Sequence, residues 1–253
     1  MLGKKYIQRL SSATIVLEML ISFSITGFAL KRPDVVESGA AWDAGYLGEI
    51  ETEIIEIPEN GTHALLTEYD AIVRETEEKS EGFADMDSGT IDDIDEDGYP
   101  ELVILATSEG EHNYPYDRKV IIAHYVRPKQ IEYFTCRIGP VGGMMNCWIY
   151  LGEEETKTFH LVYRNSLSGL IYYGVDTVVA ITDGKLNVLH TLEWSEDLNN
   201  NESEYYVDGA EDPVEFQRIY QTIKEPICED NPVYDEEAAG YSYEELRYQI
   251  LHQ

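Results

Sequence analysis

Apolar residues recur at helical spacing in the segment from Thr62 to about Ser80. Leu65, Tyr69 and Ile72 fall on one stripe of a helix, and Glu, Asp and Arg occupy most of the intervening positions. Thr62 is a suitable residue to cap the first turn. The pattern therefore predicts an amphipathic helix of about four turns that packs one face on a sheet.

From residue 82 to residue 207 the pattern shortens to the period of a strand. Short runs rich in β-branched and aromatic residues alternate there with turn residues. The runs cover residues 102–107, 119–126, 130–138, 145–151, 157–164, 170–174, 176–182, 185–194 and 204–207. Asp183-Gly184 between two of them is a strong hairpin signal. Because no segment of helical length intervenes, we expect an antiparallel meander of about eight strands.

Two shorter helices are predicted after the strands. Asp212 before Pro213, with Glu215 three residues after the Asp, is a helix start. An apolar face follows it, made of Val214, Phe216, Ile219, Tyr220 and Ile223. After a polar loop, Ser242 and Glu245 cap a last helix that reaches about residue 251. The predicted fold class is α+β, mainly β, with flanking helices and one domain over residues 62–253.

The start of the chain differs from the rest in charge and hydropathy. Residues 1–32 hold five bases and one acid, Glu18, around a mostly apolar run from Ala13 to Leu30. Such a start is typical of a signal peptide, and the run is also long enough for an uncleaved membrane anchor. The alternative is a buried first helix of a cytoplasmic protein. Export predicts a protein that is secreted or anchored at the extracellular face of the cell membrane.

An acidic tether is predicted between this start and the domain, over residues 33–61. Within it, Ile50, Ile54 and Ile57 form one short alternating piece that favours an added edge strand. Pro58-Glu59-Asn60-Gly61 then breaks the pattern.

The overall charge narrows the classes of partner. The chain has 18 Lys and Arg against 49 Asp and Glu, a formal net charge of −31, while 43% of its residues are hydrophobic. The hydrophobic content is that of a globular protein. An acidic surface repels phosphate backbones and anionic lipid headgroups, so nucleic acid is excluded as a partner and the membrane is contacted only through the N-terminal segment. The same charge favours cations and basic partners, and we expect a monomer.

Three cysteines leave two alternatives open. A hairpin centred at Val141–Gly142 would set Cys136 and Cys147 opposite each other, at a separation that suits a disulfide. The alternative is two small, buried, reduced side chains. An odd count leaves Cys228 over, and no Cys-x-x-Cys motif occurs.

One acidic segment, residues 93–102, carries a specific chemical prediction. It places carboxylates at positions 1, 3 and 5 of a tight loop, a Gly at position 6 and a further carboxylate at position 9. Hard oxygen ligands in such a loop are how Ca²⁺ is held. The predicted ligands are Asp93, Asp95, Asp97, the carbonyl of Tyr99, and Glu101 directly or through water. Position 12 is Ile104, so the loop is not a helix–loop–helix calcium site, and a single site of this kind is expected to be weak.

The segment resembles the Asp-x-Asp-x-Asp-Gly-x-Pro-Glu-Leu loop of exported bacterial proteins that carry integrin-propeller-type calcium hairpins. The resemblance is close over residues 93–102 and loose over residues 62–225, and it implies a partial-propeller-like fold and a calcium ion. Glu101 departs from the Asp that is common at that position, and the segment 85–90 interrupts the strand expected before the loop. Members of this group are mostly of unknown function, so the resemblance implies no activity.

Three functions are consistent with the sequence. The first is a non-catalytic exported or cell-surface domain whose fold is supported by one calcium ion. The second is a binding module for glycan or protein, because the chain has 19 Tyr and 3 Trp whose rings stack on ligands. The third is a hydrolase with acidic catalytic residues. The sequence lacks His-Glu-x-x-His, Gly-x-Ser-x-Gly and a phosphate-binding Gly-rich loop, and we expect His124 and His160 to be packed or surface residues in strands.

Overall fold

The computed structural model describes residues 50–57, 61–80, 87–109, 116–126, 129–140, 146–153, 157–167, 170–182, 184–229 and 239–253. The predicted signal or anchor (residues 1–32), most of the predicted tether, and the predicted turn residues Val141, Gly142 and Asp183 lie outside this part of the chain. Within it, no helix combines the length and the hydropathy that a membrane span requires.

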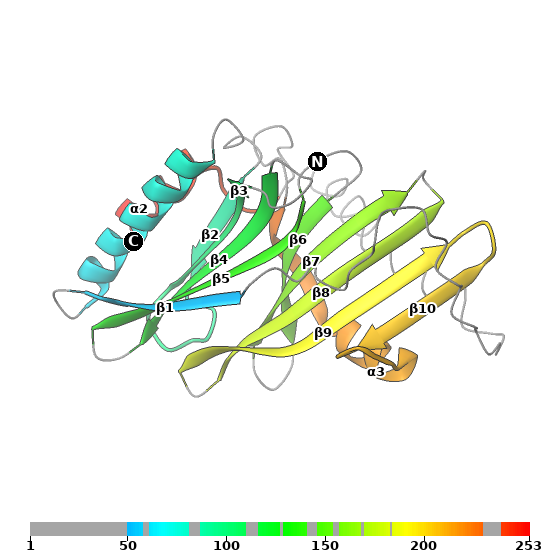
Figure 1. Cartoon of the computed structure of the whole chain (residues 1–253). Coiled ribbons are helices and arrows are strands. Elements are labelled where there is room, and N and C mark those ends of the chain that lie inside the picture. The colour runs from blue at the N-terminus through cyan, green and yellow to red at the C-terminus, as the bar shows by residue number, and fades with distance from the viewer. Residues whose placement is uncertain are drawn as a thin grey trace, which may run out of the picture. The chain divides into compact units, whose positions relative to one another are not determined.

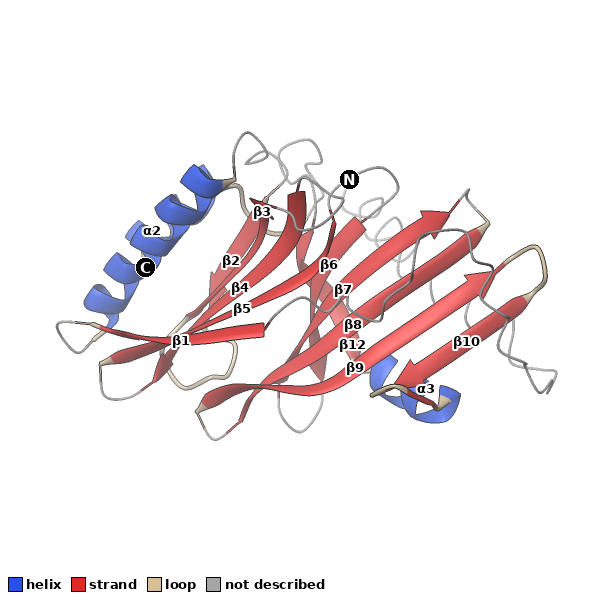
Figure 2. Ribbon diagram, in the orientation of Figure 1, coloured by secondary structure: helices blue, strands red, loops and turns tan. Residues whose placement is uncertain are grey.

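Two antiparallel sheets make up most of the fold (Figures 1 and 2). The first sheet has the order β1 (Ile50–Glu56), β5 (Gln130–Pro140), β4 (Tyr116–Val126), β3 (Glu101–Glu109), β2 (Ser88–Asp92). The second sheet has the order β11 (Ala210–Glu211), β10 (Glu202–Val207), β9 (Lys185–Asp197), β8 (Ile171–Thr182), β7 (Lys157–Leu167), β6 (Asn146–Glu153), β12 (Ile223–Glu229). The helices are α2 (Thr62–Lys79), α3 (Pro213–Tyr220) and α4 (Tyr243–Leu251). The predicted α+β, mainly β, antiparallel class is confirmed.

Three buried clusters define the layers. In the first, α2 and α4 place Leu65, Tyr69 and Leu246 against Leu102 and Ile104 of the first sheet. The second cluster lies between the two sheets and includes Val103, Ile122 and Phe134 from one and Ile149, Phe159 and Leu161 from the other. The third holds α3 on the second sheet. Both faces of β3 and β4 are therefore buried, which explains the continuous apolar runs in these strands.

The starts of α3 and α4 follow from the caps seen in the sequence. The predicted cap of α2 is wrong, because Gly61 is its N-cap, without a side-chain cap hydrogen bond, and Thr62 is the first helical residue. The Asp212 carboxylate accepts from the Glu215 N–H, with Pro213 as the first helical residue of α3. Ser242 and Glu245 form a complete capping box at α4. Two members of the predicted apolar face of α3 are wrong. Val214 is 79% exposed, and Ile223 lies beyond the helix as the first residue of β12.

The predicted single meander is divided in two after β5. β5 pairs with β4 and β1, whereas β6 pairs with β7 and β12, so the expected hairpin that would oppose Cys136 and Cys147 does not form. Both cysteines, together with Cys228, are buried thiols in the cluster between the sheets. Burial raises the pKa of Cys136 to about 12. The reduced alternative is the one observed.

Other strand boundaries also differ from the predictions. The two strands predicted over residues 170–174 and 176–182 are a single strand, β8, which begins at Ile171 and has Asp176 in its middle. The polar segment after α3 contains β12, which has Pro226 and two register shifts. β2 begins at Ser88, inside the segment expected to interrupt a strand. The edge strand expected around Ile50 and Ile54 is present as β1, paired with β5.

A buried polar network joins the first sheet to its helices. Asp87, directly before β2, has no solvent exposure, and Arg118 on β4 is 1% exposed. One oxygen of Asp87 accepts from Arg118 Nη1 and from Thr107 Oγ1, each at 2.8 Å. The other accepts from the hydroxyls of Ser80 and Tyr243, which lie at the end of α2 and the start of α4. Two strands and two helices thus depend on one carboxylate.

Replacing Arg118 is expected to destabilise the protein strongly. In Arg118→Met the Asp87 carboxylate would stay buried without its counter-charge, which costs about 3–5 kcal/mol. Urea unfolding followed by circular dichroism measures the loss. The matched control is Arg74→Met, because Arg74 pairs with Asp70 at 2.7 Å but its side chain is 54% exposed. That change should cost less than about 1 kcal/mol. Equal losses in the two variants would contradict the role given to Asp87.

Candidate metal centre

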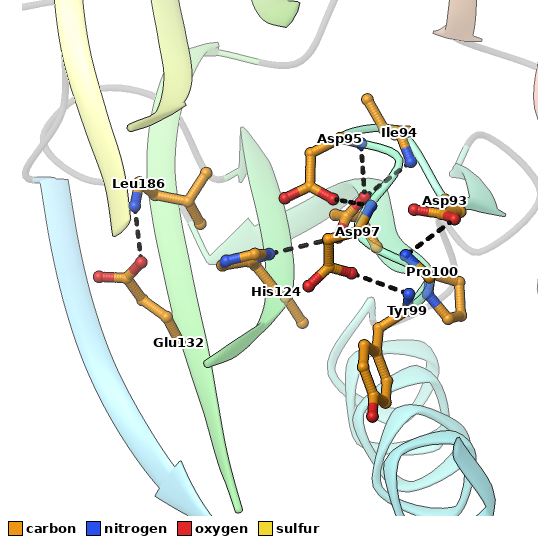
Figure 3. Close-up of polar contacts among 12 residues, drawn as sticks. Asp93, Ile94, Asp95, Asp97, Tyr99, Pro100, His124, Glu132 and Leu186 are labelled. Atoms are coloured by element: carbon orange, nitrogen blue, oxygen red, sulfur yellow. Dashed lines mark hydrogen bonds and ion pairs between the residues drawn. The ribbon is translucent and has the colours of Figure 1, made fainter. Parts of the chain in front are cut away.

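The acidic loop joins β2 to β3, so that Asp92 and Glu101 face each other at its base. Three carboxylates in the loop accept backbone N–H groups (Figure 3): Asp93 from Gly98 at 3.1 Å, Asp95 from Asp97 at 3.0 Å and Asp97 from Tyr99 at 2.8 Å. Gly98 has a φ of 91°, a conformation that side chains rarely adopt. These local bonds curl the chain and draw the carboxylates together.

The structure divides the predicted ligands into two overlapping groups. Asp93, Asp95 and Asp97 each offer one oxygen, and these atoms lie within 4.8 Å of one another. Asp95 also belongs to a second group with Glu101 and His124, with the same spacing. Asp95 is common to both, and the cluster Asp95, Glu101, His124 could hold a metal ion, as could the three Asp residues.

Glu101 braces the loop from inside. Its side chain has no solvent exposure. Its Oε2 accepts from the N–H groups of Ile94 at 2.8 Å and Asp95 at 3.3 Å, while Oε1 lies 3.2 Å from Nδ1 of His124 (Figure 3). The residue predicted as the ninth-position ligand is therefore turned toward the backbone and His124, and it is not grouped with Asp93 and Asp97.

His124 is the residue of the site that sequence reasoning missed. It was expected to be packed or at the surface, and it is 3% exposed, but it also lies beside Glu101. The neighbouring strands pair with Leu102 opposite Ala123, which brings position 124 next to position 101. Only this pairing reveals the contact, because the two residues are 23 positions apart.

The electrostatics of the loop favour a bound cation. Burial, together with the charges of Asp97 and Asp93, raises the pKa of Asp95. Burial, and then the charge of Asp95, raises the pKa of Glu101 against the lowering effect of His124. In addition, Oδ1 of Asp93 is buried and has no hydrogen-bond partner among the described residues. A cation would provide that oxygen with a partner and relieve the repulsion.

Neighbouring elements hold the loop in place. The Tyr69 hydroxyl on α2 lies 2.9 Å from the Pro100 carbonyl and 3.0 Å from the Ala123 carbonyl. Lys157 of the second sheet pairs with Glu96 at 2.6 Å, in a solvent-exposed position. The loop is thus anchored to α2, to the first sheet and to the second sheet. The role of the Tyr99 carbonyl as a ligand stays a prediction.

A second buried Asp–His pair lies in the second sheet, between Asp176 of β8 and His160 of β7. His160 Nδ1 lies 2.7 Å from Asp176, and its Nε2 lies 3.3 Å from the hydroxyl of Thr222. That hydroxyl donates to the Ile219 carbonyl at 2.7 Å. Its proton therefore points away from His160, and the geometry does not activate Thr222 as a nucleophile.

The pH dependence of stability should report on Glu101. Because the folded protein raises the pKa of this carboxyl, its stabilising contribution is present near and below about pH 4.3 and is lost as the pH rises through the raised value. In EGTA, urea unfolding between pH 4 and 7 should show this loss in the wild type and a flatter profile in Glu101→Gln. Glu211→Gln, a change at an exposed carboxyl, is the control. Identical profiles for all three proteins would contradict the assignment.

No protein-family model matches the chain, and the searches of the curated proteins and of the solved structures found no match. The resemblance to calcium-hairpin proteins, close over residues 93–102 and loose over residues 62–225, therefore remains a prediction.

Proposed function

We propose that the protein is a non-catalytic exported or cell-surface domain whose fold is supported by one calcium ion. Asp93, Asp95 and Asp97 would supply anionic oxygens, the Tyr99 carbonyl would add a neutral one, and Glu101 would brace the loop. Two observations carry the proposal: Asp93, Asp95 and Asp97 each offer one oxygen within 4.8 Å of the others, and Oδ1 of Asp93 is buried without a hydrogen-bond partner among the described residues. Oxygen-only ligands of this charge suit Ca²⁺.

A calcium ion in the loop would support the fold because of where the loop lies. It connects β2 to β3, and β3 contributes to the buried clusters on both faces of the first sheet. An ion that closes the loop would therefore stabilise the strand at its exit and the contact with Tyr69 on α2. A weak site, with a dissociation constant of about 10⁻⁴–10⁻³ M, fills at extracellular calcium levels, which agrees with the proposed export.

Calcium is expected to stabilise the protein by mass action. With 10 mM CaCl₂, a site of this affinity adds about 1.4–2.7 kcal/mol, or a rise in Tm of roughly 3–10 °C, relative to EGTA. Differential scanning fluorimetry measures the shift. The double variant Asp93→Asn with Asp97→Asn should lose it. Asp92→Asn is the matched control, because Asp92 lies next to the cluster but is outside it, and the Asn oxygen can still accept from the Asp93 N–H. Melting curves that coincide with and without calcium would refute the proposal.

His124 favours a second candidate for the ion. A nitrogen ligand beside two carboxylates suits Mn²⁺, Fe²⁺ or Zn²⁺ better than Ca²⁺. Under this alternative the ion would occupy the cluster Asp95, Glu101 and His124.

The variant His124→Asn separates the two candidates. If Ca²⁺ binds the three Asp residues, the variant should keep the calcium-dependent rise in Tm, because His124 lies outside that group. If a transition ion binds, Mn²⁺ or Zn²⁺ should stabilise the wild type more than Ca²⁺ does, and His124→Asn should remove that effect. Isothermal titration calorimetry with each ion gives the affinities. A calcium response that disappears with His124 would contradict binding by the three Asp residues alone.

A further inference from the structure

Most sheet edges in the described part of the chain are protected. β2 is covered where Gly89 exchanges two backbone hydrogen bonds with Tyr241, at 2.9 and 2.7 Å. β12 carries Pro226 and two register shifts, and β11 is only two residues long. Covering segments, prolines, bulges and short strands are the usual means of preventing a sheet from pairing with another chain.

β1 differs from these edges. It is seven residues long and regular in register, and among the described strands it pairs on one side only, with β5 (Figure 1). Ile50 and Ile54, on the same face of the strand, are 41% and 48% exposed. Glu51 and Glu53, on the opposite face, are exposed as well. The outer side of β1 thus offers a backbone ladder with an apolar pair on one face and an acidic pair on the other.

Pairing with the β1 strand of a second copy is unfavourable in the register that brings the apolar side chains together. In an antiparallel pairing of two β1 strands, the register that sets Ile50 against Ile54 also sets Glu51 of each copy opposite Glu53 of the other. Like charges directly opposite each other destabilise a pair of strands. The carboxylates of Glu51 and Glu53 therefore disfavour this self-association. A partner strand that carries basic side chains opposite these two residues would be favoured instead.

Charges of both signs lie near Glu51 and Glu53. Glu75 on α2, Glu53 and Glu51 all act on Tyr133 of β5, whose pKa is raised to about 12 by burial and then by these carboxylates. Lys119 on β4 offsets part of the charge of Glu51, and Lys79 on α2 pairs with Glu75 at 2.6 Å. The acidic character of this face therefore depends on Glu51 and Glu53, in a chain whose net charge is −31.

We propose that the outer edge of β1 binds an extended basic polypeptide segment as an added strand. The segment would carry apolar side chains opposite Ile50 and Ile54 and Lys or Arg opposite Glu51 and Glu53. The main-chain hydrogen bonds would supply affinity, and the alternation of apolar and basic side chains would supply specificity. This inference is independent of the metal centre.

A designed peptide tests the proposal with the full chain. The peptide Thr-Val-Lys-Thr-Lys-Val-Thr carries the fluorophore on its N-terminal amine and an amide at its C-terminus. Its order of side chains reads the same in both directions and so fits either strand orientation. Fluorescence anisotropy at 0.15 M salt should show binding that is lost when Glu replaces both Lys or when Pro replaces the central Thr. Hydrogen exchange at residues 50–56 should slow when the Lys peptide is added.

Two variants of equal charge give the control. Glu51→Gln with Glu53→Gln should weaken binding of the Lys peptide by about 2- to 30-fold, as expected for two cross-strand ion pairs. Glu202→Gln with Glu211→Gln removes two exposed carboxylates of the second sheet and should leave binding unchanged. The proposal is overturned by equal weakening in both double variants, by absence of binding, or by protection in the free protein of the β1 amides that do not pair with β5, since the outer edge would then be covered by the chain itself.

Discussion

The first sheet and both of its helices depend on the buried pair of Asp87 and Arg118. A carboxylate without solvent exposure is tolerated only when charge and hydrogen bonds replace water, and here four side-chain donors do so. Ser80, Thr107, Arg118 and Tyr243 come from four different elements. Their convergence sets where β2 begins and where α2 ends, and it thereby sets the position of the acidic loop that follows β2.

The loop shows how local and distant contacts combine. Its curl comes from carboxylates that accept N–H groups two to five residues away. Glu101, which is buried beneath the loop, accepts from the Ile94 N–H and lies beside His124 of the next strand, and it thereby ties the loop to the first sheet. Burial, and then the charge of Asp95, raises the pKa of Glu101. Keeping these carboxyl groups close together in their charged form therefore costs free energy. A cation held between these carboxylates would offset that cost.

Acidic side chains are arranged differently in two parts of the chain, the loop between β2 and β3 and the strand β1. At the loop, carboxylates converge on a common centre and favour a small cation. On β1 they are spread along an edge at strand spacing, where they oppose pairing with a second copy and favour a basic strand. For the remaining surface, the net charge of −31 predicts repulsion of phosphate-rich partners and selects no specific one.

The sequence alone determined the features that depend on neighbours along the chain. The caps at Asp212 and Ser242, the buried stripe of α2 and the strand-like alternation of the central region are all local, and the structure agrees with them. The convergence of Asp93, Asp95 and Asp97 is local in the same way. Only the tertiary structure decided that β5 and β6 belong to different sheets, that Pro226 lies in a strand, and that His124 meets Glu101. Periodicity shows that a strand forms but not which strand it pairs with, because that choice depends on burial shared between residues far apart in the chain.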